Sequence, residues 1–307
     1  MTIKHIVISG GGEIGFSYQG ILYETYKRNM WKYDDIQSVY ATSIGSMLAT
    51  SICLKLDFET INKYILERPY DFLNVEPHMF MNIISEKGIF DNTVIIKYLK
   101  PILNSLDLTV EITLKELYEY SNVELNIFAT ELNEFKPIQF SHKTYPDLKL
   151  VDAIYMSCSV PIVFKPYCFE DKYYFDGGLF ANFPLSYCLE QQKCEQDEIL
   201  GFKKTGSQNS SSTKIELKTI FDYVSLLLHK LIHGQNKQYT DISGNNIYII
   251  SAKPLSFNNL VNINSAEHRL KLFNNGINYV KERFDISYND ISCNDISCND
   301  ISYNHIM

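Results

Sequence analysis

The 307-residue chain contains no run of about 18 consecutive apolar residues, which is the length that a membrane-spanning helix requires. The apolar stretch near its N-terminus is short and interrupted by glycines, unlike the core of a secretory signal peptide. We therefore expect neither a signal peptide nor a transmembrane segment. The sequence predicts a cytoplasmic, soluble protein that is at most peripheral on membranes.

Basic residues are also scarce, since 28 Lys and Arg face 36 Asp and Glu and the formal net charge is −8. Nucleic acids attract basic surfaces, so this charge argues against nucleic acid as a partner. It also disfavours electrostatic docking on anionic lipid, although apolar contact with a membrane surface remains open.

Regular cysteine spacing is absent as well. The seven cysteines form no pair with the spacing of zinc ligands, so we expect no metal site. Cys53, Cys158, Cys168 and Cys188 fall in segments predicted to be structured. We expect reduced thiols, as in the cytosol.

Strand-like and helix-like segments alternate from the N-terminus. Apolar runs predict strands at 4–9 and 36–43, and helical periodicity follows each of them at 15–29 and 43–56. This alternation predicts a parallel sheet covered by helices. Further strands are expected at 125–132, 136–142 and 245–253, a hairpin-like stretch at 168–185, and helices before Pro161 and at 265–284.

Other segments are less regular. Residues 57–100 are predicted to be mostly helical, and their apolar patch from Phe72 to Ile84 either packs on the sheet or forms a lid or lipid-facing surface. A flexible polar loop is expected at 203–214, and an amphipathic helix docked on the sheet at 215–239. From Asp285 the pattern D-I-S-[YC]-N repeats four times, which predicts a disordered tail, with a small β-like cap as the alternative.

Residues 41–45, Ala-Thr-Ser-Ile-Gly, stand where the second strand turns into the second helix. A serine between small residues at such a turn is typical of a nucleophile elbow, which exposes the serine Oγ above the sheet. Ala41 replaces the usual glycine, and Gly45 is the second small residue. Ser43 is therefore a candidate nucleophile, although a simple helix N-cap explains the same residues.

Gly10, Gly12 and Gly15 match the dinucleotide fingerprint G-x-G-x-x-G. That fingerprint needs an acidic residue at the end of the second strand, where this chain has Ser43 instead. We therefore expect no nucleotide cofactor. Adjacent parallel strands share their carboxyl edge, so the N–H groups of Gly11 and Gly12 are expected about 3 Å from an oxyanion formed by attack of Ser43.

The seven histidines include none in a glycine-flanked turn after a strand, where an α/β-hydrolase places its base. His229 and His233 share one face of the amphipathic helix and are expected to be solvated. The best-placed ionisable group is Asp176, which Gly177 and Gly178 follow at a predicted strand end. A plain turn is the competing explanation of this stretch.

Taken together, these motifs resemble the patatin-like phospholipase family over about residues 4–190. Gly10–Gly15 resembles its oxyanion loop, 41–45 its elbow, and Asp176-Gly177-Gly178 its D-G-[GA] element. Two intervening segments, 128–133 and 157–166, also resemble family motifs. The chain departs from the family at Ala41, and at Ile14, where Arg or Lys is common.

The resemblance implies a three-layer α/β/α fold with a mostly parallel sheet. A catalytic core would span 4–190, residues 191–284 would complete the same domain, and 285–307 would be the repeat tail. It implies a lipid acyl hydrolase of phospholipase A or esterase type that needs no cofactor or metal. Ser43 would attack a lipid or phospholipid ester, and Asp176 would accept its proton.

Two alternatives remain open at this stage. A thioesterase, protease or transacylase would use the same pair of residues. A catalytically weak or inactive lipid-binding protein would keep the pocket without the chemistry.

Overall fold

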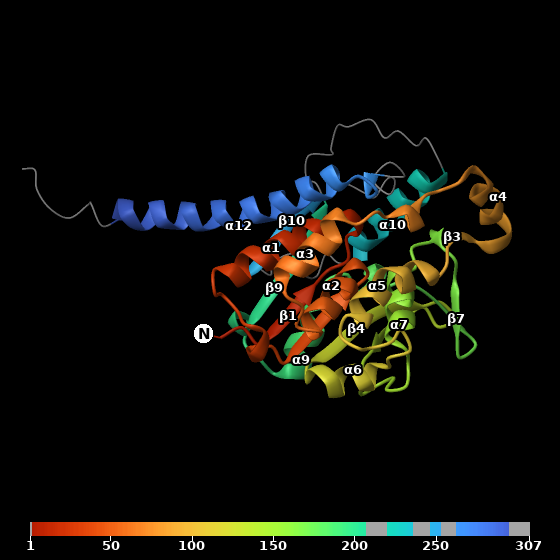
Figure 1. The fold of residues 1–307 in the computed structure, drawn as a ribbon, viewed down its shortest axis with the longest axis horizontal. Helices are drawn as coiled ribbons and strands as arrows, with labels where there is room; N and C mark the ends of the chain where they lie inside the picture. Colours follow the sequence, from red (N-terminus) through yellow and green to blue (C-terminus); the bar gives the residue numbers. More distant parts are fainter. Residues whose placement is uncertain (1, 207–219, 236–245, 253–261, 295–307) are drawn as a thin grey trace, which may run out of the picture.

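The computed structural model describes residues 2–206, 220–235, 246–252 and 262–294 (Figure 1). An eight-stranded sheet has the order β10-β9-β1-β2-β4-β8-β7, with β5 also paired to β4. Pairings from β10 to β4 are parallel, whereas those of β5, β7 and β8 are antiparallel. The strands are β1 (His5–Ile8), β2 (Ser38–Thr42), β4 (Glu124–Glu131), β5 (Lys136–Phe140), β7 (Tyr167–Phe169), β8 (Lys172–Asp176), β9 (Ile199–Gly206) and β10 (Ile247–Ala252). A separate pair joins β3 (Gly88–Phe90) to β6 (Ile162–Phe164).

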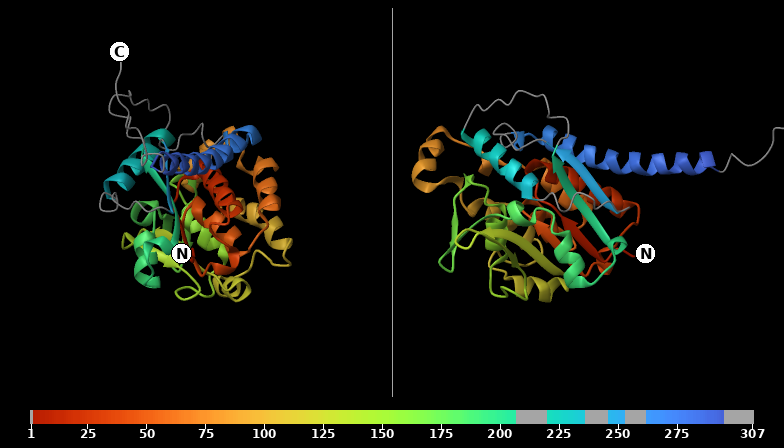
Figure 2. Two further views of the ribbon diagram at one scale, coloured as in Figure 1. Left: turned by 90° about the vertical axis from the view of Figure 1, so that its left-hand side faces the viewer. Right: turned by 180° about the vertical axis from the view of Figure 1, so that it is seen from behind.

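Helices cover both faces of the sheet (Figure 2). They are α1 (Gly15–Lys27), α2 (Ile44–Cys53), α3 (Phe58–Glu67), α4 (Pro77–Glu86), α5 (Thr93–Asn104), α6 (Leu114–Ser121), α7 (Leu150–Cys158), α8 (Gly178–Ala181), α9 (Leu185–Gln192), α10 (Ile220–Gln235) and α12 (Ala266–Asn294). None of the helices in the described ranges is both long and apolar enough to cross a bilayer.

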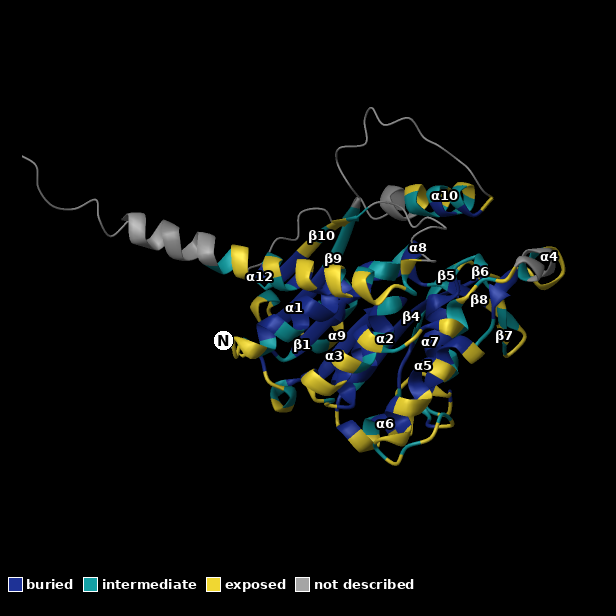
Figure 3. Cartoon of the chain, turned by 45° about the horizontal axis from the view of Figure 1, so that its top comes forward, coloured by how far each residue is buried: buried dark blue, intermediate teal, exposed yellow. Residues whose placement is uncertain are grey.

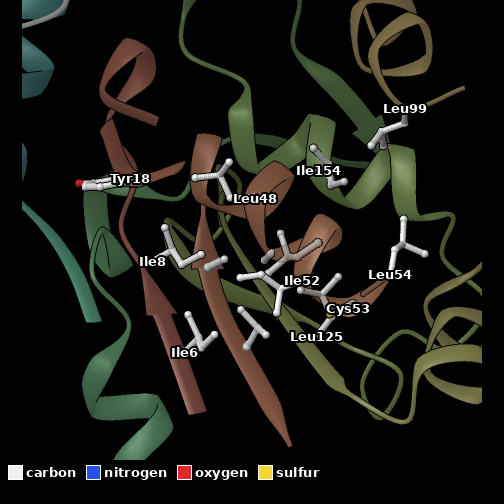
Figure 4. Packing of buried hydrophobic residues seen from close by; sticks show 14 of the residues in the cluster. Ile6, Ile8, Tyr18, Leu48, Ile52, Cys53, Leu54, Leu99, Leu125 and Ile154 are labelled. Atoms are coloured by element: carbon white, nitrogen blue, oxygen red, sulfur yellow. The ribbon is translucent and has the colours of Figure 1, made fainter. Parts of the chain in front are cut away.

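Alternation along β1 separates the two layers. Ile6 and Ile8 pack into the larger core with α1 and α2 (Figure 4). Val7 points to the opposite face, where it packs against Leu185 and Cys188 of α9. Because successive side chains of a strand face opposite ways, an all-apolar strand is buried on both faces. The predicted three-layer α/β/α fold is confirmed.

Most predicted elements form, but strand β9 was not predicted and the start of the predicted tail is helical. The polar loop expected at 203–214 begins inside β9, because Ile199 to Phe202 pair with β1 and Gly201 to Gly206 pair with β10. The rest of that predicted loop lies outside the described residues. Helix α12 runs to Asn294, into the segment predicted as the repeat tail, and 295–307 lie outside the described residues.

The predicted hairpin at 168–185 is only partly a hairpin. Strands β7 and β8 pair and reverse at Glu170 and Asp171, both of which have positive φ. The Asp176-Gly177 turn instead leads from β8 into α8, and α9 follows. The strand end expected at Asp176 is therefore present, but it is a strand-to-helix turn.

Candidate active site

Strand β4 pairs with both β2 and β8, the two strands whose ends carry Ser43 and Asp176. Thr42, the last residue of β2, pairs with Phe128. Asp176, the last residue of β8, pairs with the next residue, Ala129. Since β5 occupies the other edge of β4 at both positions, β2 and β8 meet end to end on the same edge. Ser43 and Asp176 thus become neighbours although they lie far apart in the sequence.

Ser43 has a strained backbone, as expected for a nucleophile elbow. Its φ of 54° and ψ of −130° are sparsely populated for a residue with a side chain, and such strain costs roughly 1–3 kcal/mol. Its N–H donates to Ser157 Oγ at 2.8 Å, and Ser157 in turn donates to Phe128 O at 2.6 Å. Ser43 stands at the N-cap position of α2, yet its side chain makes no capping hydrogen bond. The hydroxyl is therefore not used as a helix cap.

The small residues around the two turns are required by close approaches. A Cβ on Gly45 would lie 2.7 Å from Ile8 O, and one on Gly177 would lie 2.2 Å from Phe128 O. Ala41 is fully buried, with its methyl group in the main core. The methyl group that replaces the usual glycine hydrogen is therefore accommodated without opening the elbow.

Asp176 lies against both Ser43 and the start of α8. The Gly178 N–H donates to Asp176 Oδ1 at 2.7 Å. Burial raises the pKa of Asp176 to about 6, against opposing contributions from a hydrogen bond with Ser43, the Gly178 N–H and the charge of Lys204. A carboxyl with this pKa is ionised at neutral pH but accepts a proton far more readily than an ordinary aspartate.

The glycine loop borders the same point. The Gly10 N–H donates to Asn182 O at 3.2 Å, and Gly12 has a φ of 60°. The short 3-10 helix η1 (Gly12–Ile14) begins here. Gly11 is its N-cap and Gly12 its first residue, so neither N–H group has an acceptor within the helix. Glu13 bonds His268 of α12 at 2.8 Å, which anchors the loop.

Gly15 and Ile14 complete the loop by packing. A Cβ on Gly15 would lie 2.5 Å from the Ile44 side chain, beside the elbow. The buried Ile14 side chain folds over Gly11, since a Cβ there would lie 2.4 Å from Ile14 Cγ1. The loop itself therefore presents an apolar group at position 14.

A cavity of about 240 Å³ opens in front of these residues. Ser43, Asp176 and the glycines Gly10, Gly11 and Gly12 line it at one side. The other lining side chains are largely apolar and come from α2, α5, α8, α10 and the segments around them: Met47, Leu48, Val94, Ile95, Tyr98, Phe164, Phe175, Leu179 and Leu228. Apolar pockets with a few convergent polar groups are typical of small-molecule sites.

Three residues that line the pocket or contact Ser43 were not predicted from the sequence. Lys204 lines the cavity from the end of β9, the strand whose end was predicted as loop. Cys158 lies beside Ser43 and Ser46, and burial raises the pKa of its thiol, so the thiol stays neutral. Ser157 supports the Ser43 backbone. Ser157 and Cys158 stand in a quoted motif, but no residue pattern shows which hydroxyl reaches which amide.

Two other expectations need comment. Phe72 and Leu73, from the apolar patch at 72–84, line the pocket and also pack against the cluster around Phe90 and Val163. His229 is half-buried and lines the cavity from α10, a position that its helical pattern did not predict. The side chain of His233 lies outside the described residues.

Comparison with known proteins bears on this arrangement. The chain is 24% identical to "Probable lipid hydrolase 463L" of Invertebrate iridescent virus 6 over 89% of its own length and 86% of that protein. It is 25% identical to "Uncharacterized protein R571" of Acanthamoeba polyphaga mimivirus, over 72% and 73% of the two chains. Among solved structures, VipD from Legionella pneumophila aligns with a TM-score of 0.50 and 16% identity, covering 89% of this chain and 67% of VipD. That likeness supports the fold.

A family profile described as patatin-like phospholipase matches residues 6–189. This range holds the glycine loop, the strained Ser43 turn and the end of β8 that carries Asp176. The chain therefore belongs to the patatin-like phospholipase family.

Proposed function

We propose that this protein is a lipid acyl hydrolase that cleaves carboxylic esters through an acyl-enzyme on Ser43. The observation that carries the proposal is the contact between Ser43 and the buried carboxyl of Asp176, at the wall of an apolar cavity. Family membership and the similarity to a probable viral lipid hydrolase support the same reaction class.

In the proposed mechanism, Asp176 accepts the Ser43 proton while Oγ attacks the ester carbonyl. The N–H groups of Gly11 and Gly12 donate to the oxygen that becomes negative, and loss of one such donor typically costs about 10²–10³ in rate. Asp176 then returns the proton to the leaving alcohol. Water, activated by the same carboxylate, releases the acyl group from Ser43.

The acyl chain is proposed to occupy the apolar part of the cavity. Met47 and Leu48 lie one turn into α2 from Ser43, while Phe175 and Leu179 flank Asp176 and the start of α8. This places hydrocarbon beside the reacting carbonyl and excludes water from the acyl side. Thioester cleavage, peptide cleavage and acyl transfer would use the same residues, and the product distinguishes them.

A fluorophosphonate probe tests the enzyme against a silent binding protein. We expect covalent labelling at Ser43, located by peptide mass spectrometry, and none in Ser43→Ala protein. Matched ester, thioester and peptide substrates with one acyl chain are expected to release product fastest from the ester. Absence of labelling in folded wild-type protein would favour a lipid-binding role and contradict the proposal.

Helix α10 is the proposed contact with a lipid surface. Ser225, Leu228 and His229 face the cavity, whereas the opposite side is apolar and exposed (Figure 3). Its exposed residues are Ile220 at 66%, Tyr223 at 52%, Leu227 at 47% and Leu231 at 43%. Their spacing places them on one helix face. The net charge of −8 favours uncharged over anionic lipid.

Replacing Leu227 and Leu231 together with serine is expected to reduce co-sedimentation with zwitterionic phosphatidylcholine vesicles several-fold, because apolar area drives interfacial binding. Hydrolysis of a monomeric short-chain ester is expected to persist, since neither side chain lines the cavity. Equal vesicle binding by the variant and the wild type would exclude α10 as the contact.

A further inference from the structure

Lys204 is a charged side chain in a pocket that is otherwise mostly apolar. It lies two residues after Phe202, which pairs with Ile8, and its N–H donates to Ser9 Oγ at 2.9 Å. The C-terminal end of β9 therefore lies beside the glycine loop that follows β1. The side chain passes over that loop, with Lys204 Cδ 3.6 Å from the point where a Cβ on Gly11 would stand.

The charges around Lys204 leave it without a close counter-ion. Within the described part of the chain, no carboxylate forms an ion pair with it; Asp176 and Glu13 act on it from a greater distance. Burial lowers the pKa of Lys204, and these two carboxylates oppose that effect. A half-buried ammonium group gains most from an anion that enters the pocket, because its water is already partly lost.

An apolar side chain, Ile14, and a cationic one, Lys204, both lie beside Gly11. A substrate whose carbonyl reaches the Gly11 N–H therefore brings its neighbouring groups within reach of Lys204. Glycerophospholipids carry a phosphate a few bonds from their acyl esters, whereas diacylglycerols carry a neutral hydroxyl there. The position of Lys204 thus suits the phosphate group.

We propose that Lys204 binds the phosphate of a glycerophospholipid substrate and so selects phospholipids over neutral glycerides. This inference rests on the proposed function and adds a specificity residue from β9. The ammonium group donates to phosphate oxygens while the ester lies over Ser43.

The test compares a phosphatidylcholine with the diacylglycerol of the same acyl chains in mixed micelles at pH 8, above the pKa of about 6 of Asp176. We expect Lys204→Met to lower kcat/KM for the phospholipid about 10- to 100-fold, mainly through KM, and to affect the diacylglycerol far less. Lys204→Arg should recover most of the loss. Lys203→Met is the matched control, because Lys203 lies over the Phe183 ring and not along the cavity.

An equal loss on both substrates would overturn the proposal, since Lys204 would then act on the reaction centre. No loss on either would also overturn it. Binding of non-hydrolysable diether phosphatidylcholine to Ser43→Ala protein gives a readout without turnover. We expect Lys204→Met to weaken this binding about tenfold or more, and to leave binding of the matched diether glycerol much less affected. If only hydrolysis fails in the wild type, the proposed function is wrong and this binding result still decides the role of Lys204.

Discussion

Purified Ser43→Ala protein is expected to lose lipid ester hydrolysis by at least about 10⁴-fold, the usual cost of removing a nucleophile from a catalytic pair. The substitution removes only the hydroxyl, and the backbone N–H of residue 43 can still donate to Ser157 Oγ. Initial rates of fatty acid release on monodisperse protein measure the effect. Ser51→Ala in the same helix is the matched control, because its hydroxyl makes only a 3.4 Å bond to Met47 O.

The strained backbone at Ser43 adds a second measurement. Ala keeps the same φ of 54° with a side chain, whereas Gly populates that region at no steric cost. Ser43→Gly is therefore expected to be more stable than Ser43→Ala by about 1 kcal/mol in urea unfolding, and equally inactive. Turnover within tenfold of wild type in either variant would remove Ser43 from the mechanism.

Asp176→Asn is expected to abolish hydrolysis by about 10⁴-fold and, at the same time, to stabilise the fold at pH 8. Asparagine keeps an oxygen for the Gly178 N–H but cannot accept the serine proton. The charged carboxylate is disfavoured by burial, which is why its pKa is about 6 rather than 3.8. Removing that charge therefore relieves the cost of holding it in the folded protein.

The sign of this effect with pH follows from the raised pKa. The folded state binds the proton of Asp176 more tightly than the unfolded state does. Asp176 therefore adds fully to the free energy of unfolding below about pH 3.8, and this contribution is lost as the pH rises through about 6. The stability gain of Asp176→Asn should be on the order of 1–3 kcal/mol at pH 8 and shrink toward pH 4. Asp171→Asn, in the exposed turn between β7 and β8, should change neither rate nor stability.

The hydrolysis rate of the wild-type protein is also expected to depend on the ionisation of Asp176. Because only ionised Asp176 accepts the proton, kcat/KM is expected to fall about tenfold per pH unit below roughly pH 6. An activity that stays constant down to pH 4, or an active Asp176→Asn protein, would contradict the assigned role of Asp176.

The central strands were predictable because their sequences leave little choice. Runs such as those of β1 and β2 are apolar on both faces, which only a strand covered on both sides by helices accommodates. Strand β9 was not predicted, and its last residues were predicted as loop because Lys203 and Lys204 make the sequence polar where pairing with β10 continues. Those pairings are backbone hydrogen bonds, which the side-chain pattern does not record.

The candidate catalytic residues were predictable for a related reason. Ser43 needs small neighbours, and the glycine after Asp176 sits where a Cβ would strike Phe128 O, so the residue types themselves mark the turns. His229 shows the limit of this reasoning, since its helical pattern gave no sign that it faces a cavity.

The sequence alone determined where the turns at Ser43 and Asp176 lie, because strand-like runs end there at small residues. Tertiary structure decided what those turns are for. Consecutive residues of β4 hold Thr42 and Asp176, so the register of one strand sets the Ser43–Asp176 contact. It also decided the position of Lys204 and the pKa of Asp176, because burial and charge proximity depend on segments that are distant along the chain.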